Sequence, residues 1–129
     1  MPDKKINRKI AVIFATDVVG YSKHMEANES ETILNLRECE SILTGLFSKY
    51  EGRLFNKGGD SFLAEFPSAV SAVKCAVEFQ NAIKERNSND DPSVKLDFRI
   101  GINSGDVVIE NENLLGDGVN IAARLEALS

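Results

Sequence analysis

The hydrophobic pattern changes its period several times along the chain, and each change marks a new predicted element. Residues 9–15, KIAVIFA, form a nearly continuous apolar run, which is typical of a strand buried on both faces. Residues 94–103 alternate between apolar and polar positions, which predicts a strand with one buried face. Gly105 breaks the alternation, and a further strand is expected at 107–109.

Helical periodicity fills the segments between these strands. A loop at 17–22 leads into a first short helix, and Asn28 with Glu31 forms a predicted capping pair for the next one, which ends at Gly52. Pro67 begins another long helix. Its core face is expected to carry Val70, Val73, Val77 and Ile83.

Residues 53–66 have the pattern of two strands joined by a tight turn, and a last helix is expected at 119–128, with Val119, Ala122 and Leu128 toward the core. The predicted order is βααββαββα. It indicates an α+β fold of the ferredoxin-like or palm type, an antiparallel-rich sheet with helices packed on one face. We expect one domain over residues 1–129. Because the chain stops directly after the last helix, this domain is expected to be incomplete at its C-terminus.

Composition narrows the class of protein. No segment approaches the roughly 20 apolar residues that a membrane span requires, so no membrane partner is expected. The chain carries 20 acidic and 15 basic residues, a net charge of −5, which argues against a nucleic-acid partner. Cys39 and Cys75 lack metal-type spacing and are expected to be reduced core thiols of a cytoplasmic protein.

Two aspartates are candidate metal ligands. Asp17 follows the first apolar run, and its position alone favours an ordinary loop or capping role. Asp60 follows Gly58 and Gly59, which allow a positive φ and close approach of a ligand. If the hairpin lies beside the first strand, the two carboxylates meet and repel unless a divalent cation lies between them. Mg²⁺, bound by carboxylates and substrate phosphates, fits this set.

Asn120 and Arg124 form a third candidate group. They are four residues apart and therefore share one face of the last predicted helix. A guanidinium suits phosphate oxygens, and an amide can orient a sugar hydroxyl. Taken alone, however, the pair is more typical of an exposed polar helix face.

Three motifs, in this order, resemble the catalytic domain of the class III adenylate and guanylate cyclases: FATDVVGYS, GRLFNKGGDSFLAEFPS, and RIGINSGDVV followed by GDGVNIAARLE. The resemblance runs from about Arg8 to Ser129 and is closest to the soluble bacterial type, in which the domain begins a longer chain. It implies that the ribose 3′-hydroxyl of ATP or GTP attacks the α-phosphorus and expels pyrophosphate. The product is a cyclic nucleotide for intracellular signalling.

The resemblance also implies a role for each site residue. Asp17, Asp60 and the carbonyl of Val18 would hold two ions of Mg²⁺ or Mn²⁺. The backbone of Val19, Gly20, Tyr21 and Ser22 would contact the triphosphate. Asn120 and Arg124 would orient the ribose and stabilise the transition state from the second chain of a head-to-tail homodimer with shared sites. An isolated monomer would then hold no complete site.

Two positions depart from the family pattern. The family's purine-reading lysine falls at Asn56 and not at Lys57, and a shift of one residue turns a strand side chain to the opposite face. Lys57 can substitute only if a bulge at Gly58–Gly59 shifts the register. The second purine reader falls at Asn113, where adenylate cyclases usually carry Asp or Thr. An amide both donates and accepts, so it would select poorly between adenine and guanine.

Two alternatives remain beside the cyclase interpretation. The first is a cyclase-like dimerisation or nucleotide-binding module with weak or no turnover, which Asn56 and Asn113 favour and the retained aspartates oppose. The second is a diguanylate cyclase, whose GG(D/E)EF hairpin is similar here, but Ser61 replaces the acid and GDGVNIAARLE has no counterpart there. A later phosphate-binding lysine and further strands of the cyclase family would lie beyond Ser129, so the chain alone is expected to lack part of the site.

Overall fold

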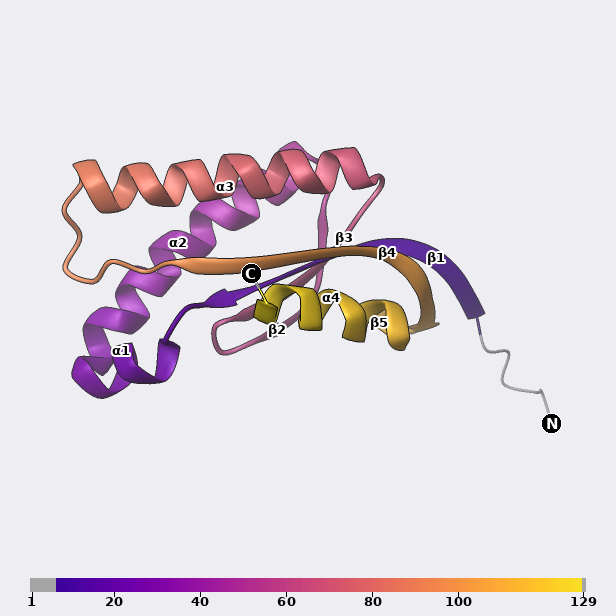
Figure 1. Ribbon diagram of the computed structural model, residues 1–129, viewed down its shortest axis with the longest axis horizontal. Coiled ribbons are helices and arrows are strands. Elements are labelled where there is room, and N and C mark those ends of the chain that lie inside the picture. Colours follow the sequence, from indigo (N-terminus) through magenta and orange to yellow (C-terminus); the bar gives the residue numbers. More distant parts are fainter. Residues whose placement is uncertain (1–6, 129) are drawn as a thin grey trace.

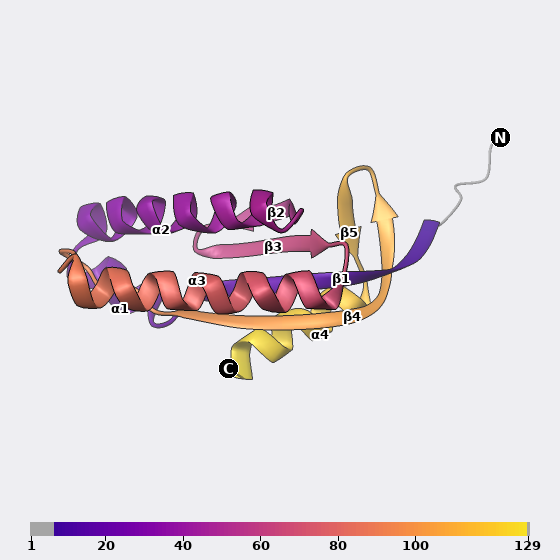
Figure 2. The same ribbon diagram turned by 90° about the horizontal axis from the view of Figure 1, so that it is seen from above.

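The computed structural model describes residues 7–128 and shows a five-stranded antiparallel sheet with helices on both faces (Figures 1 and 2). The elements are β1 (Asn7–Val18), α1 (Tyr21–Ala27), α2 (Glu29–Lys49), β2 (Arg53–Gly58), β3 (Ser61–Phe66), α3 (Ala69–Asn89), β4 (Phe98–Glu110), β5 (Asn113–Leu115) and α4 (Asp117–Leu128). The strands lie in the order β2-β3-β1-β4-β5. The predicted α+β palm-type class and the order βααββαββα are confirmed. No helix within residues 7–128 is long and apolar enough to cross a membrane.

The helices cover both faces of the sheet, which corrects the expectation of helices on one face. In β1, Val12 and Phe14 pack toward α2 and α3, whereas Ala11, Ile13 and Ala15 pack toward α4. Figure 1 shows α3 above the sheet and α4 below it. A strand that is apolar at every position needs cover on both sides, and helices on a single face cannot supply it.

The larger core lies under α2 and α3, and we call it the aromatic core. The ring of Phe14 lies 5.4 Å from that of Phe47 and 5.5 Å from that of Phe66, between ring centroids. Phe79 of α3 meets Phe98 of β4 edge to face at 5.0 Å. Each such pair adds about 0.5–1.5 kcal/mol beyond the apolar area that it buries.

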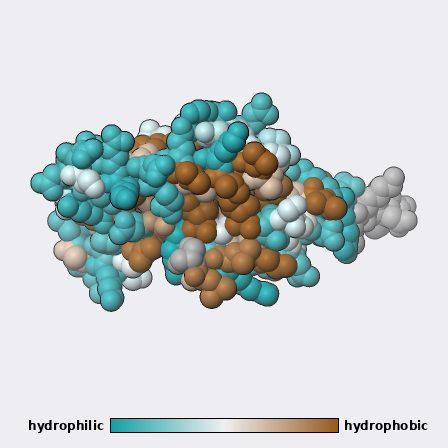
Figure 3. Space-filling model, turned by 45° about the horizontal axis from the view of Figure 1, so that its top comes forward, coloured by the Kyte–Doolittle hydropathy of each residue, from teal (hydrophilic) through white to brown (hydrophobic). Residues whose placement is uncertain are grey.

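The buried stripe of α3 differs from the one that the sequence predicted. The buried residues are Ala72, Cys75, Phe79, Ile83 and Arg86. Of the expected set only Ile83 is in the core, while Val70, Val73 and Val77 are 63%, 49% and 56% exposed. Small side chains at Ala72 and Cys75 let the helix approach the sheet, so a count of large apolar residues selected the wrong face. Figure 3 shows apolar side chains gathered on the side where α3 comes forward.

Other local expectations are confirmed. The side chain of Asn28 accepts a hydrogen bond from the Glu31 amide at the start of α2. Ser68, for which no cap was predicted, caps α3 in the same way. Cys39 and Cys75 are free and fully buried. Burial raises the pKa of the Cys75 thiol to about 12.

β4 runs without interruption through Gly105, where the sequence analysis expected a break. Gly105 pairs with Ala11 of β1, so the ladder continues past it. Residues 94–97, the start of the expected strand, precede β4, and the short strand β5 was not expected. The order of elements therefore holds, but the two expected strands merge into β4, and the place of the second is taken by β5.

α4 packs directly onto the backbone of β4, because two glycines leave room for it. A Cβ atom on Gly101 would lie 2.1 Å from the amide nitrogen of Glu126. A Cβ atom on Gly118 would lie 2.5 Å from the carbonyl oxygen of Asp106. No side chain fits at either place, so these contacts require glycine.

The inner face of α4 agrees only in part with the expectation. Val119 and Ala122 are buried as predicted, but Leu128 is 84% exposed. Glu126 takes the inner position of the last turn and is 6% exposed. A buried carboxylate needs partners, and these lie at the end of β1.

Candidate active site

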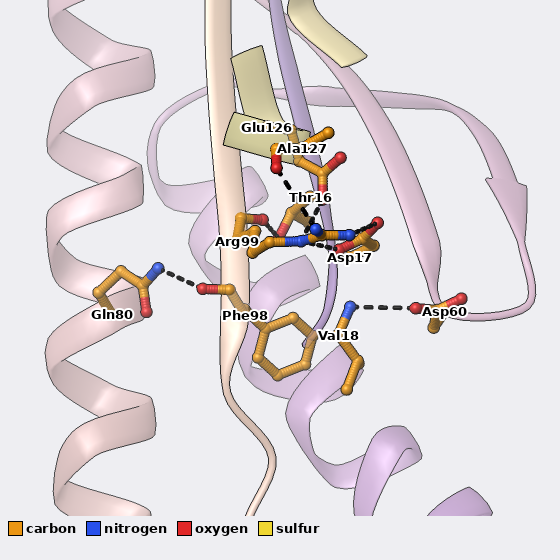
Figure 4. Close-up of polar contacts among 9 residues, drawn as sticks. All are labelled: Thr16, Asp17, Val18, Asp60, Gln80, Phe98, Arg99, Glu126 and Ala127. Atoms are coloured by element: carbon orange, nitrogen blue, oxygen red, sulfur yellow. Dashed lines mark hydrogen bonds and ion pairs between the residues drawn. The ribbon is translucent and has the colours of Figure 1, made fainter. Parts of the chain in front are cut away.

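The β2–β3 hairpin brings Asp60 to the C-terminal end of β1. β3 pairs with β1 up to Thr16 and Phe62, so the turn that follows Gly58 lies next to Asp17 and Val18. Gly59 has a φ of 59°. The amide of Val18 donates a hydrogen bond to Oδ2 of Asp60 at 3.1 Å (Figure 4). The two aspartates therefore lie at the same end of the sheet, as the sequence analysis expected.

Asp17 is held by Arg99, a residue that the sequence analysis did not select. The two residues are directly opposite in the β1–β4 register. Arg99 donates from Nε to Oδ1 and from Nη2 to Oδ2, each at 3.0 Å. The charge and hydrogen bonds of Asp17 raise the pKa of Arg99. The Thr16 hydroxyl donates to the Arg99 carbonyl at 2.6 Å, which ties the two strands together at this point.

Glu126 of α4 completes this cluster. Its Oε1 lies 3.3 Å from Nε of Arg99. Burial raises the pKa of Glu126 to about 7, and the hydrogen bond and negative charge of Asp17 add to this effect, whereas Arg99 opposes it. Asp17, Arg99 and Glu126 thus form one electrostatic group, which we call the Arg99 cluster.

The donor chemistry at this end of the sheet fits a hard divalent cation. Asp17, Asp60 and the Val18 carbonyl offer oxygen atoms, the donors that Mg²⁺ and Mn²⁺ prefer. Within residues 7–128, no group of three or more acidic, His or Cys side chains is arranged to hold a metal ion. Both carboxylate oxygens of Asp17 are bound to Arg99. The residues therefore fit the ion chemically, but only after Arg99 releases Asp17.

The expected phosphate loop follows β1 directly. Gly20 has a φ of 65° and caps α1, and both Val19 and Ser22 are exposed. The Val19 amide donates to the carbonyl of Asp97 at 2.8 Å. This N–H is already used within the chain, so it is the least suited of the loop's amides to meet a phosphate.

Asn120 and Arg124 lie on the outer side of α4, and both are exposed. Glu126 on the same helix points inward to Arg99. One helix thus presents two polar sets in different directions. The outer set does not take part in the Arg99 cluster of its own chain.

Asn56 and Asn113 line one pocket. Its volume is about 500 Å³ and its lining is Phe55, Asn56, Lys57, Glu110, Asn111, Glu112, Asn113 and Leu115. The register of the β2–β3 pairing shifts between Leu54 and Asn56, which is a β-bulge. The bulge therefore precedes Asn56 and is not at Gly58–Gly59, where it would have let Lys57 replace Asn56.

Beyond the bulge the pairing is regular, so Asn56 and Lys57 point to opposite faces of the sheet. Lys57 pairs with Phe62, an aromatic-core residue, and donates from Nζ to Glu40 of α2 at 2.6 Å. Asn56 pairs with Leu63, which packs on the α4 side of the sheet. Of these two residues, Asn56 is therefore the one on the α4 side of the sheet.

Comparisons with known proteins agree with this architecture. The model of the adenylate and guanylate cyclase catalytic domain matches residues 3–129. A putative adenylate cyclase 3 of Rhizobium meliloti is 42% identical over the whole chain, which spans 22% of that relative's length. An adenylate cyclase of Streptomyces coelicolor is 29% identical over 98% of the chain and 32% of its own length.

Solved structures give the same result. An adenylate/guanylate cyclase/hydrolase of Silicibacter pomeroyi has 38% sequence identity and a TM-score of 0.82, over 97% of this chain and 73% of the other. A bacterial light-regulated adenylyl cyclase has 27% identity and a TM-score of 0.85, over 95% and 71%. The chain belongs to the family of adenylate and guanylate cyclase catalytic domains.

The sequence analysis missed Arg99 and Glu126 for different reasons. Arg99 belongs to the polar half of an alternating strand, where a charged residue is ordinarily solvent-exposed. Glu126 lies in a helix whose apolar residues suggested Leu128 for the core. A signal was nevertheless available, because both residues lie inside the motifs RIGINSGDVV and GDGVNIAARLE.

Proposed function

We propose that this domain converts ATP or GTP to the 3′,5′-cyclic nucleotide and pyrophosphate. The ribose 3′-oxygen forms a bond to the α-phosphorus, the bond from that phosphorus to the bridging oxygen of the β-phosphate breaks, and the hydroxyl proton is released. The observation that carries the proposal is the placement of Asp17 and Asp60 at the same end of β1, with Asp60 hydrogen-bonded to the Val18 amide. Family membership supports the reaction class.

In this proposal Asp17, Asp60 and the Val18 carbonyl would hold two ions of Mg²⁺ or Mn²⁺. Bound there, the ions would supply positive charge at the 3′-hydroxyl and the triphosphate. The Asp60–Val18 hydrogen bond fixes the hairpin carboxylate relative to β1 before substrate binds. Amides of the loop Val19 to Ser22 bind phosphate oxygens, with Gly20, Tyr21 and Ser22 as the principal donors because Val19 is already bonded to Asp97.

Asn120 and Arg124 act on the substrate of a second copy of the chain. Both are exposed on α4 and point away from the Arg99 cluster, which supports their use across an interface. Asn120 orients the ribose. Arg124 meets the charge that develops on the phosphate oxygens in the transition state, where a preorganised cation is most effective. A two-fold dimer then has two shared sites.

The pocket of Asn56 and Asn113 receives the purine base. Each amide can donate and accept, so the pair can face the edge of adenine or of guanine. This chemistry supports a site with weak selection between the two nucleotides. Asn56→Lys should therefore raise the ratio of ATP to GTP use, because it restores the residue type that the family carries at this position.

One observation favours a second function, a nucleotide-binding or dimerisation module without turnover. Arg99 engages both oxygens of Asp17, so the metal site is not ready for an ion in this conformation. A module of this kind would bind nucleotide but would not cyclise it. The reaction products separate the two possibilities.

The test is an incubation of the purified full-length protein with Mn²⁺ and either ATP or GTP, with cyclic AMP, cyclic GMP and pyrophosphate quantified. Asp60→Asn is the matched control, since it removes the charge and keeps the shape of the side chain. Cyclic nucleotide that disappears in the control supports a cyclase. If the protein is folded and dimeric, binds nucleotide and forms no product, the cyclase proposal is wrong and the domain is a binding module.

A further inference from the structure

Arg99 occupies the carboxylate that the proposed metal site requires. Its two bonds to Asp17 have the side-by-side geometry of a bidentate arginine–carboxylate pair, the stronger form of such contacts (Figure 4). The pair is fixed by the β1–β4 register and does not depend on a loop. A divalent cation can bind Asp17 only when Arg99 gives up at least one of these bonds.

Glu126 offers Arg99 a second carboxyl acceptor at 3.3 Å. The Glu126 side chain is 9% exposed, compared with 33% for Arg99 and 19% for Asp17. The backbone of Glu126 lies against Gly101, which leaves no room for the helix to come closer and gives the side chain a fixed origin. Arg99 therefore lies between two carboxylates, one that faces the proposed metal site and one that is buried behind it.

We propose that Arg99 is a positioning residue that moves from Asp17 to Glu126 when a divalent cation binds Asp17 and Asp60. Glu126 makes this exchange possible, because its buried carboxyl group lies beside Arg99 and can accept the guanidinium that the ion displaces. Without Glu126, the displaced Arg99 would keep its charge beside a dication with no buried acceptor. This inference rests on the proposed function, since it takes the same two aspartates as metal ligands.

Arg99 and Glu126 should affect metal binding in opposite directions. In titrations of the purified full-length protein with Mn²⁺ and no nucleotide, free Mn²⁺ is measured by electron paramagnetic resonance. Arg99→Gln removes the competitor and should tighten binding about tenfold. Glu126→Gln removes the alternative acceptor and should weaken binding about tenfold. In the double variant the effect of Glu126→Gln should vanish, because no guanidinium remains to be displaced.

Matched controls separate this exchange from a general change of charge. Arg37→Gln, at an exposed position of α2, removes one positive charge elsewhere and should leave Mn²⁺ binding unchanged. Glu85→Gln, at an exposed position of α3, removes one negative charge elsewhere and should also leave Mn²⁺ binding unchanged. Arg99→Lys keeps the charge but cannot form the bidentate pair, so its affinity for Mn²⁺ should lie between those of wild type and Arg99→Gln. If Arg99→Gln does not fold, as judged by circular dichroism, Arg99→Lys carries the test.

The outcomes distinguish the exchange from the metal site itself. Arg99 variants that bind Mn²⁺ no tighter than wild type would overturn the exchange. So would a Glu126→Gln effect of equal size with and without Arg99, because Glu126 would then contribute only negative charge. If Asp60→Asn binds Mn²⁺ as well as wild type does, the metal site is wrong, and the proposed function fails with it.

Discussion

The two faces of the sheet are built from different kinds of residue. The face under α2 and α3 buries large rings such as Phe14 and Phe79, whereas the buried residues under α4 are all aliphatic, several of them alanines such as Ala11 and Ala122. Large rings contribute apolar area and therefore stability. Small residues let α4 lie against the backbone of β4 and hold Glu126 beside Arg99. The comparison teaches that one sheet can place its main stabilising contacts and its candidate chemistry on opposite faces.

The largest effect on stability should come from the aromatic core. Phe79 is fully buried and packs against Phe98, so Phe79→Ala leaves a cavity and should reduce the free energy of unfolding by about 3–5 kcal/mol. Urea denaturation followed by circular dichroism measures the loss. Val77→Ala, on the exposed side of the same helix, is the control. A loss below about 1 kcal/mol for Phe79→Ala would show that this face is not the main source of stability.

A smaller loss of stability, with a functional consequence, should follow from Gly101→Ala. The new Cβ would meet the backbone of Ala122 and Glu126, so α4 must move, at a cost of about 1–3 kcal/mol. Because α4 carries Asn120 and Arg124, cyclase activity should fall further than the loss of folded protein explains. The control is Gly45→Ala, at an exposed position of α2, where the added Cβ would have no atom within 4 Å. That control should stabilise by about 1 kcal/mol. Equal effects of the two substitutions in thermal melts would contradict close packing at Gly101.

Next in size is a pH effect of Glu126. Its pKa in the folded chain is about 7, raised from 4.5, so the folded state binds more protons than the unfolded state between these values. Stability should then fall as the pH rises through this window, by on the order of 2 kcal/mol. Glu126→Gln should flatten the dependence in denaturation curves with a chelator at pH 5, 6, 7 and 8. The slope should remain in the exposed control Glu85→Gln. If it also remains in Glu126→Gln, another group causes the pH dependence.

The smallest effect is expected for the exposed valines of α3. Val73 is 49% exposed, so Val73→Ala should change the free energy of unfolding by less than about 0.5 kcal/mol. The measurement is a urea titration at two protein concentrations. A loss of 2 kcal/mol that grows with concentration would mean that this stripe is covered by a second copy, and the comparison of the faces would have to include that contact.

The sequence predicted those features of the fold that depend on local pattern. The apolar run of β1, the tight turn at Gly58–Asp60 and the Asn28 cap all have signals within a few residues. The placement of Asp17 and Asp60 at one sheet end followed from one assumption, that the hairpin lies beside β1, and the register confirms this assumption. The roles of these residues in metal binding and catalysis stay predictions.

Features that depend on long-range packing were not predictable. The buried stripe of α3 is set by how close Ala72 and Cys75 bring the helix to the sheet, and the larger valines therefore lie outside. The burial of Glu126 depends on Arg99, which lies 27 residues earlier in the chain. The bulge before Asn56 arises in the pairing of β2 with β3, for which the sequence has no local signal.

The central claim is that Asp60 and Arg124 serve one cyclase site from two chains. Asp60→Asn and Arg124→Ala should each abolish cyclic nucleotide formation when expressed alone. When both variants are co-expressed in equal amounts, half of the dimers are mixed and one of their two sites is intact, so about a quarter of the wild-type activity should return. A co-expressed sample as inactive as either variant, from a wild type that forms product, would place the two residues in different sites and contradict the account.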